Sequence, residues 1–237
     1  MRLISWNTNY NSKRRTHEED VVLLRALDAD ILVLSETAAP HAPNSRNTNW
    51  IGNASPGLAV VAREGLCLEA HRANSSAPSL LSGFHISGDL NFFLLAVWPV
   101  HLKGEQNYHA ILMSGLELYG DSLGQGSAVM AGDFNSSTRV SSQRSSHPKF
   151  VAAAKKIGLL SAYHFHTGES HGQESVSTYR HVAGGDSEFH IDYCFVSCEL
   201  ASAATVSVLR SDQWVTLSDH YPLVLDIPDA AIEGRMR

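Results

Sequence analysis

The chain has 237 residues, of which 43% are hydrophobic and 18% charged, the composition of an ordinary soluble globular protein. Its formal net charge of −6 excludes a protein that covers most of its surface with Lys and Arg to bind nucleic acid, so any contact with phosphates must come from local basic segments. The longest apolar run, Phe92 to Val100, is too short to span a bilayer, and the N-terminus turns polar at Asn7, which argues against a signal peptide. Cysteines without a CxxC motif indicate reduced thiols and a cytoplasmic protein: Cys67, Cys194 and Cys198.

The N-terminal segment predicts a strand, a helix and a second strand. Residues Arg2 to Trp6 alternate in polarity as a strand does. Thr16 and Glu19 have the spacing of a capping box, and the residues after them repeat with helical spacing. Ile31 to Leu34 is a short apolar run, typical of a buried strand. This order predicts a βαβ unit.

The next segment predicts two strand pairs. Gly57 to Ala62 and Leu66 to Ala70 have the pattern of a hairpin that turns at residues 63–65. Phe84 to Ile86 and Asn91 to Val97 have the pattern of a second pair, with its turn at Gly88-Asp89. Hairpins mixed with a βαβ unit indicate mixed sheets rather than a purely parallel one.

The second half predicts helices over Gln106–Tyr119 and Phe150–Leu160, with a strand at Val129–Ala131 between them. Residues 161–190 are rich in His, Gly and Ser and show no clear period, so we expect a long loop region there. The remaining apolar runs predict three final strands, at Ile191–Val196, Ala204–Leu209 and Leu223–Ile227.

The chain shows no internal repeat and no linker, so we expect one domain over residues 1–228 and a C-terminal tail over residues 229–237. Strands outnumber helices. The predicted fold class is therefore α/β, with two mixed, mostly antiparallel sheets packed face to face and helices outside.

Polar residues stand at the ends of the apolar strands, which is where open α/β sheets build active sites. Most have an ordinary alternative role alone: Asn7 as a turn former, Glu36 as an acid at a helix start, His101 as a loop histidine and Asp133 as the start of an Asx turn. Their joint occurrence favours a functional site. The full set is Asn7, Glu36, His101, Asp133, Asn135, Asp192, Asp219 and His220.

Among these residues, Asp192 is the one for which a purely structural role is hardest to justify. It lies between Ile191 and Tyr193 in an apolar strand, where an unpaired carboxylate would cost several kcal/mol if buried. It therefore requires a metal, a cation or a hydrogen-bond donor.

In this order, the motifs resemble those of the endonuclease/exonuclease/phosphatase superfamily, which includes DNase I, exonuclease III-type abasic endonucleases, neutral sphingomyelinases and inositol polyphosphate 5-phosphatases. The resemblance covers nearly the whole chain and is specific to the superfamily, but it does not select a subfamily. The motifs are Trp6-Asn7, Leu34-Ser35-Glu36-Thr37, Pro99-Val100-His101-Leu102, Gly132-Asp133-Phe134-Asn135, His190-Ile191-Asp192-Tyr193 and Ser218-Asp219-His220.

This resemblance implies a four-layer α/β sandwich and a Mg²⁺ or Mn²⁺ cofactor. Glu36 would be the principal metal ligand, helped by Asn7 and Asp219. The chemistry agrees, because hard cations prefer carboxylate and amide oxygens and neutralise the charge that protects a phosphodiester from attack.

The same resemblance implies the catalytic roles. Asp133 would orient or activate the attacking water, and Asn135 would hold a phosphate oxygen. His220 would bind the scissile phosphate or serve in acid–base chemistry, with Asp192 hydrogen-bonded behind it. His101 matches the position of a catalytic histidine in DNase I-like and sphingomyelinase-like members.

The substrate contacts are less specific. The basic segments are Ser12 to Arg15 and Ser136 to Lys149; Arg139, in the second, is a candidate contact along with Asn135. Phe189 resembles the aromatic residue that lines a flipped-sugar pocket in abasic endonucleases, although it would also serve simply to close the end of a sheet. The dipeptide Trp98-Pro99 stands where abasic endonucleases tend to have a tyrosine, which weakens that assignment.

Three functions remain compatible with the sequence. The leading one is a monomeric endo- or exonuclease that hydrolyses DNA or RNA by direct water attack and does not bind membranes. The second is a phosphatase or phosphodiesterase for a small molecule, a nucleotide or a lipid head group. The third is a binding protein that has lost catalysis. Four histidines in the expected loop suggest surface residues, phosphate contacts or a second metal such as zinc: His164, His166, His171 and His181.

Overall fold

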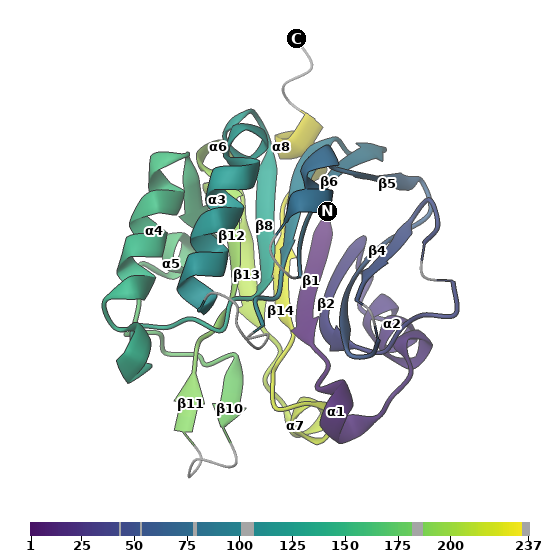
Figure 1. Cartoon of the computed structure of the whole chain (residues 1–237), viewed down its shortest axis with the longest axis horizontal. Coiled ribbons are helices and arrows are strands. Elements are labelled where there is room, and N and C mark those ends of the chain that lie inside the picture. Colours follow the sequence, from purple (N-terminus) through teal and green to yellow (C-terminus); the bar gives the residue numbers. More distant parts are fainter. Residues whose placement is uncertain (43, 53, 78–79, 101–106, 182–186, 234–237) are drawn as a thin grey trace.

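The computed structural model describes residues 1–42, 44–52, 54–77, 80–100, 107–181 and 187–233. Two six-stranded sheets pack face to face, and helices cover their outer faces (Figure 1). This four-layer α/β sandwich confirms the predicted fold class.

The first sheet contains one parallel pair among its described strands, β1 with β2, and its other neighbours run antiparallel. The parallel pair brings the carboxyl ends of both strands to one edge. The strands in order are β13 (Thr205–Val208), β14 (Leu223–Asp226), β1 (Arg2–Asn7), β2 (Ile31–Thr37), β4 (Gly57–Ala62) and β3 (Thr48–Ile51).

The second sheet repeats this arrangement, with β7 and β8 as its parallel pair within the described strands. A separate ribbon of β10 (Tyr179–His181) and β11 (Ser187–Phe189) projects from one end of the sandwich (Figure 1). The same end carries α1 (Tyr10–Lys13) and α7 (Asp212–Leu217). The strands of the second sheet in order are β5 (Leu66–Ala70), β6 (Leu81–Gly88), β7 (Phe92–Val97), β8 (Ala128–Asp133), β12 (Asp192–Ser197) and β9 (Leu159–Ser161).

The helices are short apart from α3. The capping box predicted at Thr16 is confirmed, because its hydroxyl accepts from the Glu19 amide at 3.2 Å and the Glu19 carboxylate accepts from the Thr16 amide at 2.7 Å. The helices are α1 (Tyr10–Lys13), α2 (His17–Arg25), α3 (Tyr108–Gly124), α4 (Ser146–Lys156), α5 (Ala162–Thr167), α6 (Cys198–Ala201), α7 (Asp212–Leu217) and α8 (Asp229–Glu233).

Alternating side chains of the strands divide the core. Leu3 packs between the two sheets, whereas its neighbour Ile4 faces outward and packs in the cluster that contains Leu24 of α2. Trp6 also faces outward and meets Trp214 of α7 edge to face, with ring centroids 5.3 Å apart. Each fully buried side chain of this size stabilises the fold by about 1.5–3 kcal/mol.

An aromatic cluster anchors the chain just after β8. Phe134 is fully buried, and its ring centroid lies 5.7 Å from that of Phe150 and 5.4 Å from that of Tyr193. Gly132, two residues before Phe134, has a φ of 152°, and a Cβ there would stand 1.8 Å from the Val97 carbonyl oxygen. Only glycine therefore allows the end of β8 to lie this close to β7.

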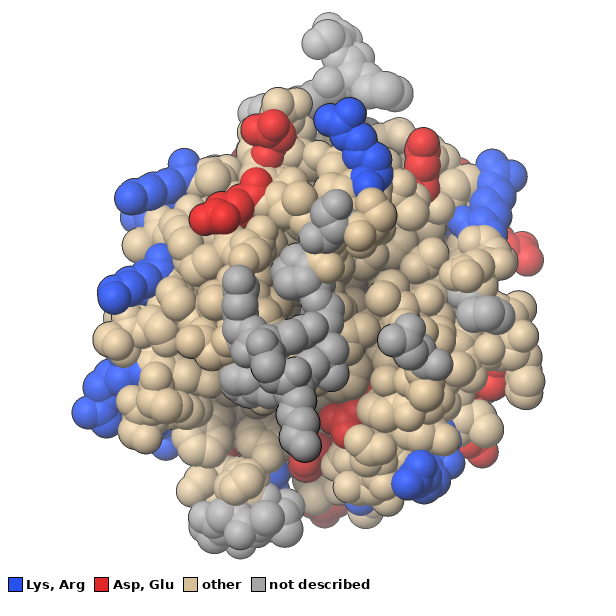
Figure 2. Space-filling model, viewed as in Figure 1, with Lys and Arg blue, Asp and Glu red and all other residues tan. Residues whose placement is uncertain are grey.

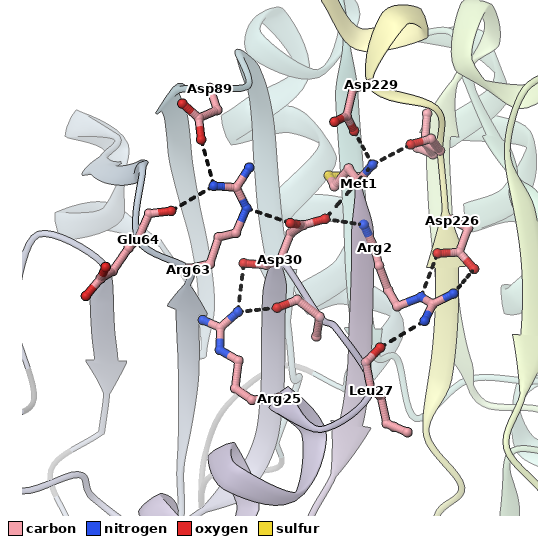
Figure 3. A network of polar contacts seen from close by, with 12 residues as sticks. Met1, Arg2, Arg25, Leu27, Asp30, Arg63, Glu64, Asp89, Asp226 and Asp229 are labelled. Atoms are coloured by element: carbon pink, nitrogen blue, oxygen red, sulfur yellow. Dashed lines mark hydrogen bonds and ion pairs between the residues drawn. The ribbon is translucent and has the colours of Figure 1, made fainter.

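The predicted hairpin of residues 57–70 is wrong, because β4 and β5 belong to different sheets. The turn between them instead crosses from one sheet to the other. Arg63 holds this crossing by donating to Asp30, just before β2 of the first sheet, at 2.6 Å and to Asp89, just after β6 of the second, at 2.7 Å (Figure 3). Local alternation predicted both strands correctly but carries no information on their partners.

Two further expectations are corrected. The helix expected over Phe150–Leu160 lies at Ser146–Lys156, because Gly158 at a φ of 86° turns the chain into strand β9. Residues 161–190 are not one long loop, since they contain α5, β10 and β11. Elements of three to six residues are too short to produce a recognisable period.

The C-terminal segment expected as a tail over residues 229–237 begins with helix α8, and Ile232 of this helix is buried in the core between the sheets. The Met1 ammonium group donates to the Ile227 carbonyl at 2.7 Å and to the Asp229 carboxylate (Figure 3). These contacts hold the start of β1 and the start of α8 together. Among the described residues, no helix has the length and apolar character needed to cross a membrane.

Candidate active site at one edge of the sandwich

The carboxyl ends of β1, β2 and β8 meet the start of β12 at the edge opposite Met1. Asn7 ends β1 and pairs in register with Ser35 of β2, the residue before Glu36. Asp133 ends β8 and lies opposite Asp192 of β12 in register, because these two strands are antiparallel. The structure thus brings together side chains that are far apart in the sequence.

Glu36 reaches the site through an irregularity in its strand. The register between β2 and β4 shifts after Leu34, and Glu36 has a φ of 50°. Such a bulge re-aims a side chain away from the regular sheet. Burial raises the pKa of the Glu36 carboxyl, while hydrogen bonding to Asn7 and the charge of His220 oppose this. Glu36 and His220 are therefore close enough to interact electrostatically.

His220 and Asp192 form a buried pair. The imidazole Nδ1 of His220 lies 2.9 Å from Asp192 Oδ2, and both side chains are almost fully buried. Burial alone would lower the pKa of His220, but the carboxylates of Asp192 and Asp133 raise it to about 10. Thr178, in a segment expected to be a loop, holds Asp192 by accepting from its backbone amide at 3.0 Å. His220 is thus an imidazolium at neutral pH.

Asp133 is a second buried group of the site with a shifted pKa. Burial and the Asp192 carboxylate raise the pKa of Asp133 to about 7. Its oxygens accept from the Asn7 amide at 3.0 Å, from the Asn135 side chain at 3.2 Å and from the Asn135 backbone at 2.8 Å. Asn135 adopts a left-handed φ of 49°, which turns its side chain back towards Asp133. A pKa near 7 suits a general base at neutral pH.

Asp219 lies at the more exposed side of the site. It accepts from Asn9 Nδ2 at 2.8 Å, and the Asn9 backbone donates to the Asn7 side chain at 3.0 Å. Ser218 ties this loop to β1 by donating its hydroxyl to the Asn7 carbonyl at 2.7 Å. Sequence reasoning missed Asn9 and Ser218. Ser218 belongs to the Ser-Asp-His motif and Asn9 follows Asn7 by two residues, so proximity to the motifs was the available signal.

A pocket of about 330 Å³ opens beside these groups. Tyr179 of β10 lines it, with its ring centroid 4.6 Å from that of His220. Burial, followed by the charge of Asp219, raises the pKa of the Tyr179 phenol to about 12, so it stays protonated. Lys13 and Arg180 also line this pocket. Tyr179 was missed because it lies in the segment expected to be a loop.

The residues expected to contact substrate extend the same edge. Phe189 stacks on Tyr179 with ring centroids 6.5 Å apart, and the guanidinium of Arg139 lies 6.0 Å from the Phe189 ring centroid. Arg15, from the first basic segment, instead pairs with Asp20 at 2.7 Å and packs on Trp6. Among the described residues, Lys and Arg visible in Figure 2 are scattered, mostly near the rim of that face, and form no single patch.

The donor atoms at this edge fit a hard divalent cation. Glu36 and Asp219 offer carboxylate oxygens and Asn7 offers an amide oxygen, which are the ligands that Mg²⁺ and Mn²⁺ prefer. The buried Asp192 Oδ1 has no hydrogen-bond partner in the structure. Asp133, Asp192 and His220 also lie close enough to share an ion, but the hydrogen bond between His220 and Asp192 favours a proton-transfer group instead. His101 lies outside the described residues.

Comparisons with known proteins identify the fold. No family model matches the sequence, and no curated protein matches it. Among solved structures, the 3′ phosphatase NExo from Neisseria, bound to a product DNA hairpin, is 19% identical with a TM-score of 0.71, over 96% of this chain and 99% of that one. An AP endonuclease from Archaeoglobus fulgidus is 17% identical with a TM-score of 0.64, over 96% and 99%.

A truncated TDP2 from Caenorhabditis elegans is 14% identical with a TM-score of 0.67, over 94% of this chain and 96% of that one. These similarities extend over nearly the full length of each chain. The chain therefore has the DNase I-like fold of the endonuclease/exonuclease/phosphatase proteins, as its motifs indicated.

Proposed function

We propose that this chain is a divalent-metal-dependent phosphoric ester hydrolase that cleaves DNA or RNA by direct water attack. The observation that carries the proposal is the convergence of Asp133, Asp192 and His220, whose side chains each place one donor atom within 4.8 Å of the others. In this cluster the Asp133 carboxyl has a pKa of about 7 and the His220 imidazole a pKa of about 10. At neutral pH one accepts a proton while the other retains one.

Each residue of the site has its own role in the proposed reaction. Asp133 accepts the proton of the attacking water. His220, held at Nδ1 by Asp192, presents its positive charge to the phosphate as negative charge develops. Asn135 holds a phosphate oxygen with its amide. Glu36, Asp219 and Asn7 would hold Mg²⁺ or Mn²⁺, which when bound neutralises phosphate charge and stabilises the leaving oxygen.

A nucleic acid fits the surroundings of this site. Arg139, Phe189 and Tyr179 form a continuous cationic and aromatic series that begins next to His220. Aromatic rings stack on bases, and guanidinium groups pair with phosphates. Among the proteins of the same fold, NExo is a 3′ phosphatase seen with a product DNA hairpin, and the protein from Archaeoglobus fulgidus is named an AP endonuclease. We further propose that the protein acts as a monomer in the cytoplasm.

One observation favours a second candidate, a phosphatase or phosphodiesterase for nucleotides or other small esters. The pocket beside Asp219 has a volume of about 330 Å³, which is in the size range of small-ligand sites. A ligand the size of a nucleotide would fit in this pocket and would need no contact with the protein surface outside it.

The deciding experiment offers plasmid, single-stranded, abasic and RNA substrates with Mg²⁺, Mn²⁺ or EDTA, and follows phosphate release from nucleotides and sugar phosphates in parallel. We expect cleavage of a polynucleotide that EDTA abolishes. Phosphate release alone would establish the second candidate. Full activity of a folded His220→Ala variant would contradict the assigned mechanism.

A further inference from the structure

Four histidines and one glutamate that have no role in the proposed reaction lie together around α4, α5 and the segment that leads to β12. His164 lies on α5 and His147 on α4, while His171 and Glu174 lie in the connection that follows α5. His190 precedes β12. The side chain of Glu174 is only 2% exposed and that of His164 9%, so these groups have little access to water.

Three of these residues already have the spacing of metal ligands. His164, His171 and Glu174 each offer a donor atom, and these atoms lie within 4.8 Å of one another. His164 Nε2 is 3.1 Å from Glu174 Oε1, and the His164 and His171 rings stack 3.5 Å apart. Two ligands of a tetrahedral zinc ion, each with a bond of about 2.0–2.1 Å, stand roughly 3.3 Å apart. The spacing of the donor atoms is therefore close to that of zinc ligands, and the two stacked rings, now 20° apart, would have to tilt so that both nitrogens point at one ion.

Two buried atoms in the cluster have no hydrogen-bond partner in the structure: Glu174 Oε2 and His190 Nε2. The Nδ1 of His190 lies 2.8 Å from the Val176 carbonyl and must carry the proton, which leaves a lone pair on Nε2. Among the described residues, Glu174 forms its ion pair with His164 and not with a Lys or an Arg. A buried carboxylate oxygen without a donor is costly unless a cation satisfies it.

Hydrogen bonds behind the cluster orient the imidazoles as they do in metal sites. His171 Nδ1 lies 3.0 Å from His147 Nε2, and His147 Nδ1 lies 2.9 Å from the Ser136 hydroxyl. One consistent proton arrangement runs from His171 to His147 to Ser136 and leaves the lone pair on His171 Nε2 available. Histidines that bind metals usually donate their other ring N–H to such a partner.

His164 also has a hydrogen-bond partner on its other ring nitrogen. Its Nδ1 lies 2.7 Å from the Ser161 hydroxyl, which can either donate to this nitrogen or accept from it. Without a metal, Nε2 carries the proton that it shares with Glu174. In the metal-bound form this single ring proton would stand on Nδ1 and be donated to Ser161, which would leave the lone pair of Nε2 for the metal. Burial lowers the pKa of His171 to about 3, which keeps that imidazole neutral as a ligand must be.

We propose that His164, His171 and Glu174 bind a Zn²⁺ ion through two imidazole nitrogens and one carboxylate oxygen. Imidazole nitrogens with one carboxylate are a ligand set that zinc accepts and that Mg²⁺ does not prefer. The ion would fasten α5 and the connection after it. His147 joins this group to α4, and His190 joins it to the start of β12, which carries Asp192.

The test uses full-length protein stripped of metal with a chelator and dialysed, in the Glu36→Gln background so that the proposed catalytic ligands are weakened. Co²⁺ is added as a spectroscopic probe, and Zn²⁺ is added in competition. We expect one equivalent of Co²⁺ to produce the visible absorption bands of a low-coordinate site, and Zn²⁺ to remove them. We also expect Zn²⁺ to raise the thermal midpoint, because it binds only the folded state.

Variants locate the site. His171→Ala and the isosteric Glu174→Gln should each weaken Co²⁺ and Zn²⁺ binding by more than about tenfold and abolish the thermal shift. His166→Ala is the matched control, since His166 is exposed on the same short helix α5. Circular dichroism shows that each variant is folded. The proposal is overturned if no stoichiometric Co²⁺ spectrum appears, or if folded Glu174→Gln binds both metals as tightly as the His166→Ala control.

Discussion

Asp133 and Asp192 face each other across the antiparallel pair of β8 and β12, so two carboxyl groups that are each 1% exposed share one strand end. Like charges this close oppose each other's ionisation. His220 bonds to Asp192, whereas burial and the Asp192 carboxylate raise the pKa of Asp133. The proposed base and its cationic partner therefore arise from one arrangement of three buried groups.

The pH dependence of cleavage should follow these two groups. Asp133 must be ionised to accept a proton, so we expect kcat/KM to rise as pH passes through about 7. His220 must be protonated, so we expect the rate to fall as pH passes through about 10. Initial rates between pH 5 and 11 (roughly the span needed to define both limbs) provide the measurement. A rate that is flat across this range would separate both groups from the chemistry.

Asp192→Asn should move the alkaline limb to lower pH. Burial lowers the pKa of His220, and the variant removes the largest charge that opposes this effect, so the pKa of His220 should fall. We expect kcat to fall by about 10²-fold or more with little change in KM, as for loss of a general acid–base group. NMR titration of the His220 ring gives the pKa directly. Asp121→Asn, on α3, is the control for a carboxylate remote from the site.

Glu36→Gln should weaken the response to Mg²⁺ or Mn²⁺. The amide is of nearly the same size but lacks the charge that makes a carboxylate a strong ligand for hard cations. We expect the metal concentration for half-maximal activity to rise by about tenfold or more, while the protein stays folded. Glu117→Gln, an exposed residue of α3, should behave as the wild type. Identical metal titrations for the two variants would remove Glu36 from the proposed ligand set.

Arg139→Ala should weaken nucleic-acid binding more than catalysis. A guanidinium that contacts a phosphate contributes mainly to affinity and to its salt dependence. We expect KM for a polynucleotide to rise several-fold at 100 mM salt and the salt slope of binding to decrease by about one. Arg72→Ala, exposed on the turn after β5, serves as the control of equal charge. If both variants lose affinity equally, the effect is one of net charge and not of a contact at Arg139.

Gly132→Ala should destabilise the fold. The new Cβ would stand 1.8 Å from the Val97 carbonyl oxygen, at a φ of 152° that side chains rarely adopt. We expect a loss of about 3 kcal/mol or more in the free energy of unfolding, measured by urea denaturation. Gly120→Ala on α3 meets no atom within 4 Å and should leave stability unchanged or raise it by up to about 1 kcal/mol. A Gly132→Ala variant as stable as Gly120→Ala would contradict the close packing of β7 and β8.

Much of the local structure could be predicted from sequence, because local signals are strong in this chain. Buried runs such as Ile31 to Leu34 predict strands directly, and Thr16 with Glu19 satisfies the amides at the start of α2 through neighbours in sequence. The predictions that were wrong concern which strands pair with one another and where short elements lie. Alternation in β4 and β5 does not say that Arg63 joins two sheets, and the short elements between residues 161 and 190 have no period to detect.

By itself, the sequence determined which chemical groups stand at the ends of buried strands, and their order was enough to predict the fold class. Only the tertiary structure decided that His220 pairs with Asp192 and that the pKa of the Asp133 carboxyl group rises to about 7. It also decided that His164, His171 and Glu174 converge. The physical reason is that strand formation depends on neighbouring residues, whereas pKa values and ligand sets depend on burial and on distances between groups remote in the chain.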